Sequence, residues 1–300
     1  MLPHEATAFP AVWGGCWLQH CLKERFMDFL EILKVLLFGI VEGYTEWLPI
    51  SSTGHLILVE NLVHLNQPEA FWNVFKVVIQ LGAILAVVVL FWSKLWPFSR
   101  QKTREERNDT WVLWFKIIVA CIPAAIVGIP LDDILDKYLS TPTVIAIMLL
   151  VYGVVFIWIE RENKNKRFPL NDIRDLTFKT ALFIGMFQCL SLIPGTSRSG
   201  ATIIGAMLLG CSRAVSAEFS FFLGIPVMFG ASLVKILKHG LIFTGAQWFI
   251  LIFGMLVSFI VALITIRYLM SYIRKHDFTI FGYYRIVLGI IVLLYFGFAA

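Results

Sequence analysis

Long apolar runs alternate along the chain with short polar segments. Six of these runs are about 17–25 residues long, the length a helix needs to cross roughly 30 Å of hydrocarbon. They cover residues 73–92, 111–130, 143–160, 217–235, 248–268 and 281–299. This pattern predicts an all-α polytopic membrane protein with six transmembrane helices.

Two further apolar stretches, 29–65 and 180–211, are interrupted by polar and helix-breaking residues. The interruptions are Glu42, Glu46, Pro49 and 51–54 in the first stretch, and 194–195 and 197–200 in the second. Neither half of either stretch is long enough to span a bilayer. Because irregular backbone at membrane depth must be buried in protein or line a wet cavity, we predict two re-entrant helix hairpins.

The two interrupted stretches match one another when 146 is added to the residue number. The matched polar or glycine pairs are Gly39 and Gly185, Glu42 and Gln188, Ser51 and Ser197, Thr53 and Ser199, and Gly54 and Gly200. We interpret them as an internal repeat, with repeat one at about 27–160 and repeat two at about 178–300. Chance matching of small residues is the alternative interpretation.

Positive charge is distributed unevenly between the connecting segments. Segments 93–110, 161–179, 212–216 and 267–280 hold 15 Lys and Arg residues, whereas 62–72, 131–142 and 236–247 hold only Lys137 and Lys238. Because positively charged loops stay on the cytoplasmic side, the first group is predicted to be cytoplasmic. The two hairpins then enter from opposite sides, which predicts an inverted-topology repeat with both hairpin tips near the midplane.

Composition and the N-terminal segment complete this picture. With 59% hydrophobic and 15% charged residues, a soluble domain could not cover its own surface. The net charge of +5 comes from the loops, so no nucleic-acid partner is expected, and the five dispersed cysteines indicate neither disulfides nor a zinc site. Residues 1–26 are a poor signal peptide and are interpreted as a disordered or spurious extension, which leaves 27–300 as a single membrane domain.

The turn of the first hairpin carries acidic, hydroxyl and imidazole groups. Glu42 and Glu46 share one helix face, and two carboxylates inside a membrane imply a function or a partner. They could act as acid and base, or hold a divalent cation. Three hydroxyls follow that could cap the next helix or supply a nucleophile, and His55 beyond them is a candidate proton carrier. The hydroxyls belong to Ser51, Ser52 and Thr53.

The turn of the second hairpin carries one basic residue, Arg198. A guanidinium at membrane depth requires an anion, and its fork suits phosphate oxygens. The surrounding hydroxyls, predicted to help bind the anion, belong to Ser197, Ser199 and Thr202. In the alternative interpretation, Arg198 pairs with Glu42 or Glu46 and only joins the hairpins. We also expect Arg198 to be the only fixed cation within reach of the two carboxylates.

These residues lie in two motifs that resemble the signature motifs of the undecaprenyl-diphosphatase family, the bacitracin-resistance type of membrane phosphatase. The motifs are EGYTEWLPISSTGH at 42–55 and PGTSRSGAT at 194–202, and the similarity continues through FQC at 187–189 and SAEFSF at 216–221. It extends from Met27 to the C-terminus. A second family of membrane lipid phosphatases is excluded, because its K-x6-R-P motif does not occur and Ile204 stands where its histidine should follow Arg198.

The resemblance implies hydrolysis of undecaprenyl diphosphate to undecaprenyl phosphate and phosphate. It places this reaction at the outer face of the bacterial plasma membrane, where it recycles the lipid carrier for wall synthesis and confers bacitracin resistance. It also implies dependence on a divalent cation, Mg²⁺ or Ca²⁺. The residues on the family's functional positions are Glu42, Glu46, Ser52, His55 and Arg198, supported by Ser197 and Thr202.

Our mechanistic hypothesis has Arg198 and the hydroxyls bind the diphosphate while Ser52 or a water attacks the terminal phosphorus, assisted by His55 or a Glu. An inverted repeat with broken helices is also the architecture of secondary transporters. The alternative function is therefore a transporter or flippase of an anionic polyprenyl lipid. Besides this lipid and the bilayer itself, the sequence leaves open a homodimer.

Overall fold

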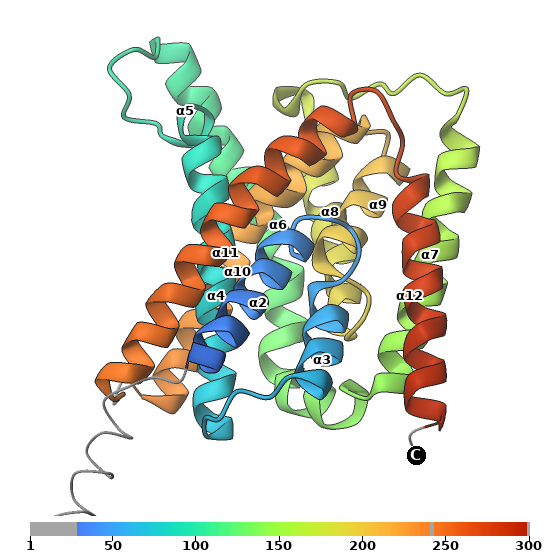
Figure 1. Ribbon diagram of the computed structural model, residues 1–300. Coiled ribbons are helices and arrows are strands. Elements are labelled where there is room, and N and C mark those ends of the chain that lie inside the picture. Colours follow the sequence, from blue (N-terminus) through green and yellow to red (C-terminus); the bar gives the residue numbers. More distant parts are fainter. Residues whose placement is uncertain (1–28, 241–242, 299–300) are drawn as a thin grey trace, which may run out of the picture.

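The described part of the chain is helical. The computed structural model describes residues 29–240 and 243–298 (Figure 1). Within these residues the only β-type pairing is an isolated bridge between Leu170 and Cys211. The predicted extension at 1–26 lies outside the described residues.

Six of the described helices are long and apolar enough to cross a membrane. They are α4 (Glu69–Leu90), α6 (Arg104–Leu139), α7 (Pro142–Asn163), α10 (Arg213–His239), α11 (Gly245–Tyr272) and α12 (Thr279–Phe298). The six predicted spans are thus confirmed. Most of these helices begin earlier or end later than their apolar runs, because backbone hydrogen bonding does not stop where the hydrocarbon ends.

The remaining helices are short. They are α2 (Phe29–Thr45), α3 (Ser52–Leu62), α5 (Trp92–Leu95), α8 (Phe178–Cys189) and α9 (Arg198–Leu208), together with the 3₁₀ turns η1 (Ile173–Asp175) and η2 (Leu190–Leu192). At 1.5 Å per residue, the 11-residue helices α3 and α9 reach only about 16 Å, half the thickness of the hydrocarbon. In Figure 1, α2, α3, α8 and α9 lie between α4, α10 and α11 on one side and α7 and α12 on the other.

Glycines set the depth at which the short helices pack. A Cβ on Gly39 of α2 would lie 2.9 Å from the Gly254 carbonyl oxygen of α11, and a Cβ on Gly185 of α8 would overlap the Ala120 carbonyl of α6. Small residues let helix backbones approach closely in this way. Gly39 and Gly185 are one of the pairs that the 146-residue correspondence relates. Gly39 of α2 and Gly185 of α8 therefore each mark a close crossing against a long helix.

Candidate active site

The turns before α3 and α9 have the same backbone geometry. Ser51 has φ 72° and Ser197 has φ 71°, and these two are the described non-glycine residues with positive φ. Each is the N-cap of its helix: Gly54 N donates to Ser51 Oγ at 3.4 Å, and Gly200 N donates to Ser197 Oγ at 3.2 Å. Left-handed backbone at a serine costs energy, which typically marks functional sites. In the first turn, the capping alternative therefore describes Ser51.

Glu46 lies in the turn between α2 and α3 and contacts residues of both turns. Ser52 Oγ donates to Glu46 Oε2 at 2.6 Å, and Arg198 Nη2 donates to Glu46 Oε1 at 3.2 Å. All three side chains come from the predicted motifs. The structure therefore brings the predicted hydroxyl, carboxylate and guanidinium into one continuous chain of contacts.

Further contacts from both halves of the chain enclose Arg198. Its Nη1 donates to the Ser220 carbonyl at 2.9 Å, and its guanidinium lies over the Trp47 ring at 5.1 Å. Gly224 makes room for it, since a Cβ there would come within 2.8 Å of Arg198 Cζ. Within the described residues, Arg198 Nε has no hydrogen-bond partner although it is buried. The predicted ion pair with Glu46 is thus formed, and the guanidinium still has a free N–H.

Glu42 lies one turn before Glu46 on α2 and is also buried. It lies within electrostatic reach of both Glu46 and Arg198. Among the described residues there is no cluster of three or more His, Cys, Asp or Glu side chains that could hold a metal ion by itself. Two carboxylates still fit Mg²⁺, which commonly takes one or two carboxylates and completes its shell with water and substrate phosphates.

Two of the predicted hydroxyls of the second turn, those of Ser199 and Thr202, are buried. Ser199 Oγ lies within hydrogen-bonding distance of the Glu46 and Leu48 carbonyl oxygens, at 3.2 and 3.3 Å. Thr202 Oγ1 lies 2.7 Å from Ser220 Oγ, which ties α9 to α10. In the first hairpin, Thr53 is exposed instead.

Arg285 of α12 is a second buried cation at the tips. Its Nη1 donates to the Pro49 carbonyl at 3.1 Å, and its Nη2 donates to the carbonyls of Gly195 and Thr196 at 2.8 and 2.9 Å. The sequence analysis did not predict this second buried cation, which binds the backbone of both turns. Sequence reasoning counted the residues of the two turns and treated 281–299 as a plain span, although a lone Arg in an apolar run was a usable signal.

His55 lies on the first turn of α3, three residues after Ser52, and is held at both ring nitrogens. Nδ1 lies 2.7 Å from the Ser51 carbonyl oxygen, and Nε2 lies 2.7 Å from the Tyr284 hydroxyl. The hydroxyl of Ser52 donates to Glu46. The structure therefore gives Ser52 a carboxylate partner and connects His55 to α12.

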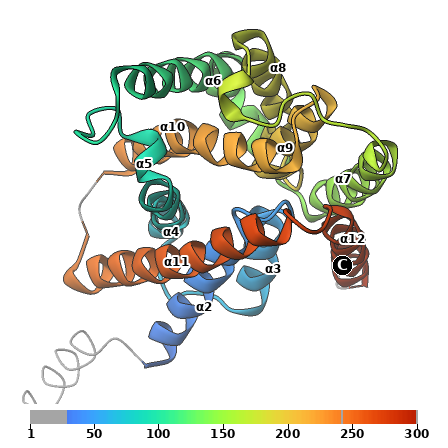
Figure 2. The same cartoon turned by 90° about the horizontal axis from the view of Figure 1, so that it is seen from above.

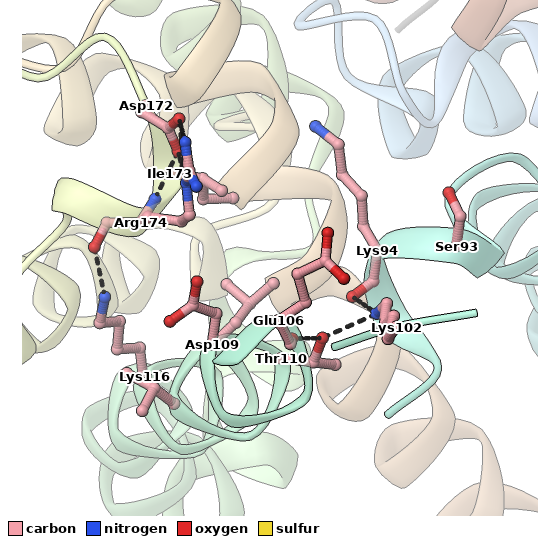
Figure 3. A pocket seen from close by; sticks show the side chains of 12 residues that line it. Ser93, Lys94, Lys102, Glu106, Asp109, Thr110, Lys116, Asp172, Ile173 and Arg174 are labelled. Atoms are coloured by element: carbon pink, nitrogen blue, oxygen red, sulfur yellow. Dashed lines mark hydrogen bonds and ion pairs between the residues drawn. The ribbon is translucent and has the colours of Figure 1, made fainter. Parts of the chain in front are cut away.

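A water-accessible cavity of about 410 Å³ lies elsewhere, between α5, α6 and η1 (Figure 3). Within its lining Arg174 pairs with Asp172, and Lys94 pairs with Glu218 of α10, outside the lining. The hydrogen bonds from Arg174 lower the pKa of Asp172 to about 2. No predicted site residue lines this cavity. The candidate active site is therefore defined by the contacts between the turn before α3 and the turn before α9.

Comparison with known proteins gives a consistent result. Residues 35–291 match the family described as Bacitracin resistance protein BacA. The chain is 60% identical over 270 residues to an undecaprenyl-diphosphatase of Enterococcus faecalis, covering 89% of this chain and 98% of the relative. It is 58% identical over 270 residues to that of Lachnoclostridium phytofermentans, covering 90% and 98%, and 57% identical over 273 residues to that of Streptococcus mutans, covering 90% and 97%.

Proposed function

The chain belongs to the bacitracin resistance protein BacA family, and on this premise we propose that it hydrolyses undecaprenyl diphosphate to undecaprenyl phosphate and inorganic phosphate. The match covers nearly the whole length of several relatives that carry the name undecaprenyl-diphosphatase. The protein is accordingly a multi-pass membrane hydrolase. Recycling of the wall-synthesis lipid carrier and bacitracin resistance fit the family.

The contacts of Glu46 carry the mechanistic part of the proposal. Its carboxylate accepts the Ser52 hydroxyl hydrogen bond at 2.6 Å, so it is placed to take the proton when the hydroxyl oxygen attacks phosphorus. In this route the bond from Ser52 oxygen to the terminal phosphorus forms while the bond to the lipid phosphate breaks. Water then releases inorganic phosphate from the serine. In the alternative route a water attacks directly and Glu46 takes its proton.

The guanidinium of Arg198 supports binding of the diphosphate oxygens. Its Nη2 donates to Glu46, its buried Nε–H has no hydrogen-bond partner among the described residues, and guanidinium N–H groups suit phosphate oxygens. The hydroxyls of Ser51 and Ser197 are used by their own helix caps. They therefore shape the turns, and substrate binding falls mainly to Arg198 and the backbone N–H groups of the turns.

A divalent cation, Mg²⁺ or Ca²⁺, would be held by Glu42 and Glu46 together with substrate oxygens. Bound there, it would supply electrostatic stabilisation of the phosphate charge. One Arg at the reacting group cannot balance two carboxylates and a diphosphate. Arg285 pairs with neither carboxylate in the described part of the chain, because its guanidinium donates to the backbone carbonyls of both turns.

We further propose that α2–α3 and α8–α9 are re-entrant hairpins related by an inverted-topology repeat. The support is the short length of α3 and α9, the matching positive φ of Ser51 and Ser197, and the matching helix crossings at Gly39 and Gly185. Single cysteines at Asn66 and Asn171, in a cysteine-free background, should be labelled from opposite sides of sealed vesicles. Labelling of both from one side would overturn this topology.

We propose that the site opens toward the outer face of the bacterial plasma membrane, and the charges of the loops support this orientation. Segments 93–110 and 161–179 hold 5 and 6 Lys or Arg residues, and 62–72 holds none. The lipid tail of the substrate would remain in the bilayer while its diphosphate reaches the tips.

Phosphate release by the purified chain in detergent tests the function. The full chain should release inorganic phosphate from undecaprenyl diphosphate, whereas a transporter or flippase of the same lipid would bind it and release none. Rapid-quench labelling with a terminally ³²P-labelled substrate separates the two routes, because only attack by Ser52 leaves label on the protein. Absence of release under any metal condition would overturn the phosphatase proposal.

A further inference from the structure

The two hydrogen bonds of His55 determine where its proton lies. A backbone carbonyl can only accept, so the 2.7 Å contact with the Ser51 oxygen requires the proton on Nδ1. The neutral ring then carries its lone pair on Nε2, which accepts from the Tyr284 hydroxyl at 2.7 Å. Any proton that His55 takes up must therefore be bound at Nε2, beside Tyr284.

Tyr284 also fixes the plane of the imidazole. The two rings are nearly parallel, with an interplanar angle of 6° and centroids 5.6 Å apart. His55 lies on α3 and Tyr284 on α12, helices from opposite ends of the chain that lie on the same side of the molecule in Figure 2. The next residue, Arg285, is buried and binds both tips, so the α12 backbone at this point is anchored to the site.

From these contacts we propose that Tyr284 is a positioning residue for the reaction. It holds the His55 ring in the Nδ1–H tautomer with Nε2 as the proton-exchanging atom. This inference rests on the proposed phosphatase function. Ser52 and His55, both on α3, then have separate roles. The Ser52 hydroxyl donates to Glu46, whereas His55 exchanges its proton on the side that faces α12.

Tyrosines near membrane interfaces often serve only as anchors, and the test must separate the two roles. Tyr284→Phe removes the hydroxyl and keeps the ring. Tyr283→Phe is the matched control, since Tyr283 is the adjacent exposed tyrosine of α12. We expect Tyr284→Phe to lower kcat roughly 10- to 100-fold with KM within about twofold, the scale for a misplaced catalytic group. Tyr283→Phe should keep wild-type kcat, and both variants should keep the wild-type Tm in detergent.

A double-mutant cycle asks whether Tyr284 acts through His55. In a His55→Gln background, adding Tyr284→Phe should change kcat less than about twofold, because residues that act as a unit are not additive. A full additional loss, or wild-type kcat in Tyr284→Phe while the wild-type chain is active, would overturn the role of Tyr284 and leave the phosphatase function intact. A wild-type chain that releases no phosphate would overturn both.

The tautomer can be measured without changing Tyr284. Side-chain ¹⁵N NMR of the histidine-labelled wild-type chain, with His55 assigned by the signal lost in His55→Gln, should show a protonated Nδ1 and an unprotonated Nε2 in neutral His55. The opposite tautomer would overturn the proposal.

Discussion

The Ser52 hydroxyl donates a 2.6 Å hydrogen bond to the Glu46 carboxylate across the turn that joins α2 to α3. The other oxygen of this carboxylate accepts from Arg198 of the opposite hairpin. Glu46 therefore connects a candidate nucleophile to a candidate phosphate-binding group. Its buried position is explained by these two partners, which satisfy a charge that would otherwise be costly inside a membrane.

Glu46→Gln should lower kcat by at least about 100-fold, the low end for removing a general base. The amide oxygen can still accept the hydrogen bond from Ser52. However, the amide cannot act as a base, and the substitution removes the negative charge that faces Arg198. Phosphate release in detergent measures the effect. Glu31→Gln is the matched control, because Glu31 is a buried, ion-paired carboxylate at the other end of α2. Wild-type kcat in Glu46→Gln would show that the carboxylate is structural.

Sequence patterns predicted the components of this site because they lie within two short motifs. Turn residues and helix periodicity placed Glu42, Glu46 and Ser52 together, and the 146-residue correspondence placed Arg198 opposite them. The first of these inferences needed only local geometry, as did the six spans, whose apolar length alone decides their existence. The second needed the repeat and the charges of the loops as well.

What the sequence did not predict depends on contacts between distant segments. Arg285 and Tyr284 follow Arg198 by more than 80 residues, and only the packing of α12 brings them to the tips. The orientation of Ser199 toward the carbonyls of the first hairpin likewise depends on how the two turns meet. No periodicity within either motif contains this information.

Arg198→Lys should abolish most turnover and leave the fold intact. The guanidinium reaches the Ser220 carbonyl and Glu46 at once while keeping a free N–H, and a lysine ammonium has neither the fork nor the reach. Turnover and Tm in detergent should be compared with Arg174→Lys, a substitution of the same kind in an exposed loop. A near-wild-type kcat in Arg198→Lys would remove the residue from the site.

Arg285→Lys should lower stability as well as activity. Its guanidinium serves three backbone carbonyls of the two tips, and an ammonium at that depth cannot reach all three. Each buried carbonyl left without a donor costs roughly 1–3 kcal/mol. We therefore expect a larger fall in Tm for Arg285→Lys than for Arg198→Lys, which loses fewer such bonds. An unchanged Tm in both variants would show that Arg285 does not hold the tips together.

Gly185→Ala should destabilise the second hairpin. A Cβ at this position would overlap the backbone of Ala120, so α8 and α6 would have to separate. Overpacking of this kind typically costs about 1–3 kcal/mol. Gly230→Ala is the control, because nothing lies within 4 Å of a Cβ at Gly230 of α10. A Tm in Gly185→Ala equal to that of Gly230→Ala would contradict the close crossing.

The last prediction concerns Glu42 and the divalent cation. Glu42 is buried one turn from Glu46, and the single Arg at the reacting group already pairs with Glu46. Because the diphosphate adds two to three further negative charges, we expect activity to require Mg²⁺ or Ca²⁺. Chelator should abolish phosphate release and added Mg²⁺ should restore it.

Glu42→Gln should lose at least about 100-fold in kcat. In Glu46→Gln, the remaining activity should need more metal for half-saturation. Full activity of the wild-type chain in chelator, together with wild-type kcat in Glu42→Gln, would show that Arg198 and protonation of a carboxylate balance the charge without a metal.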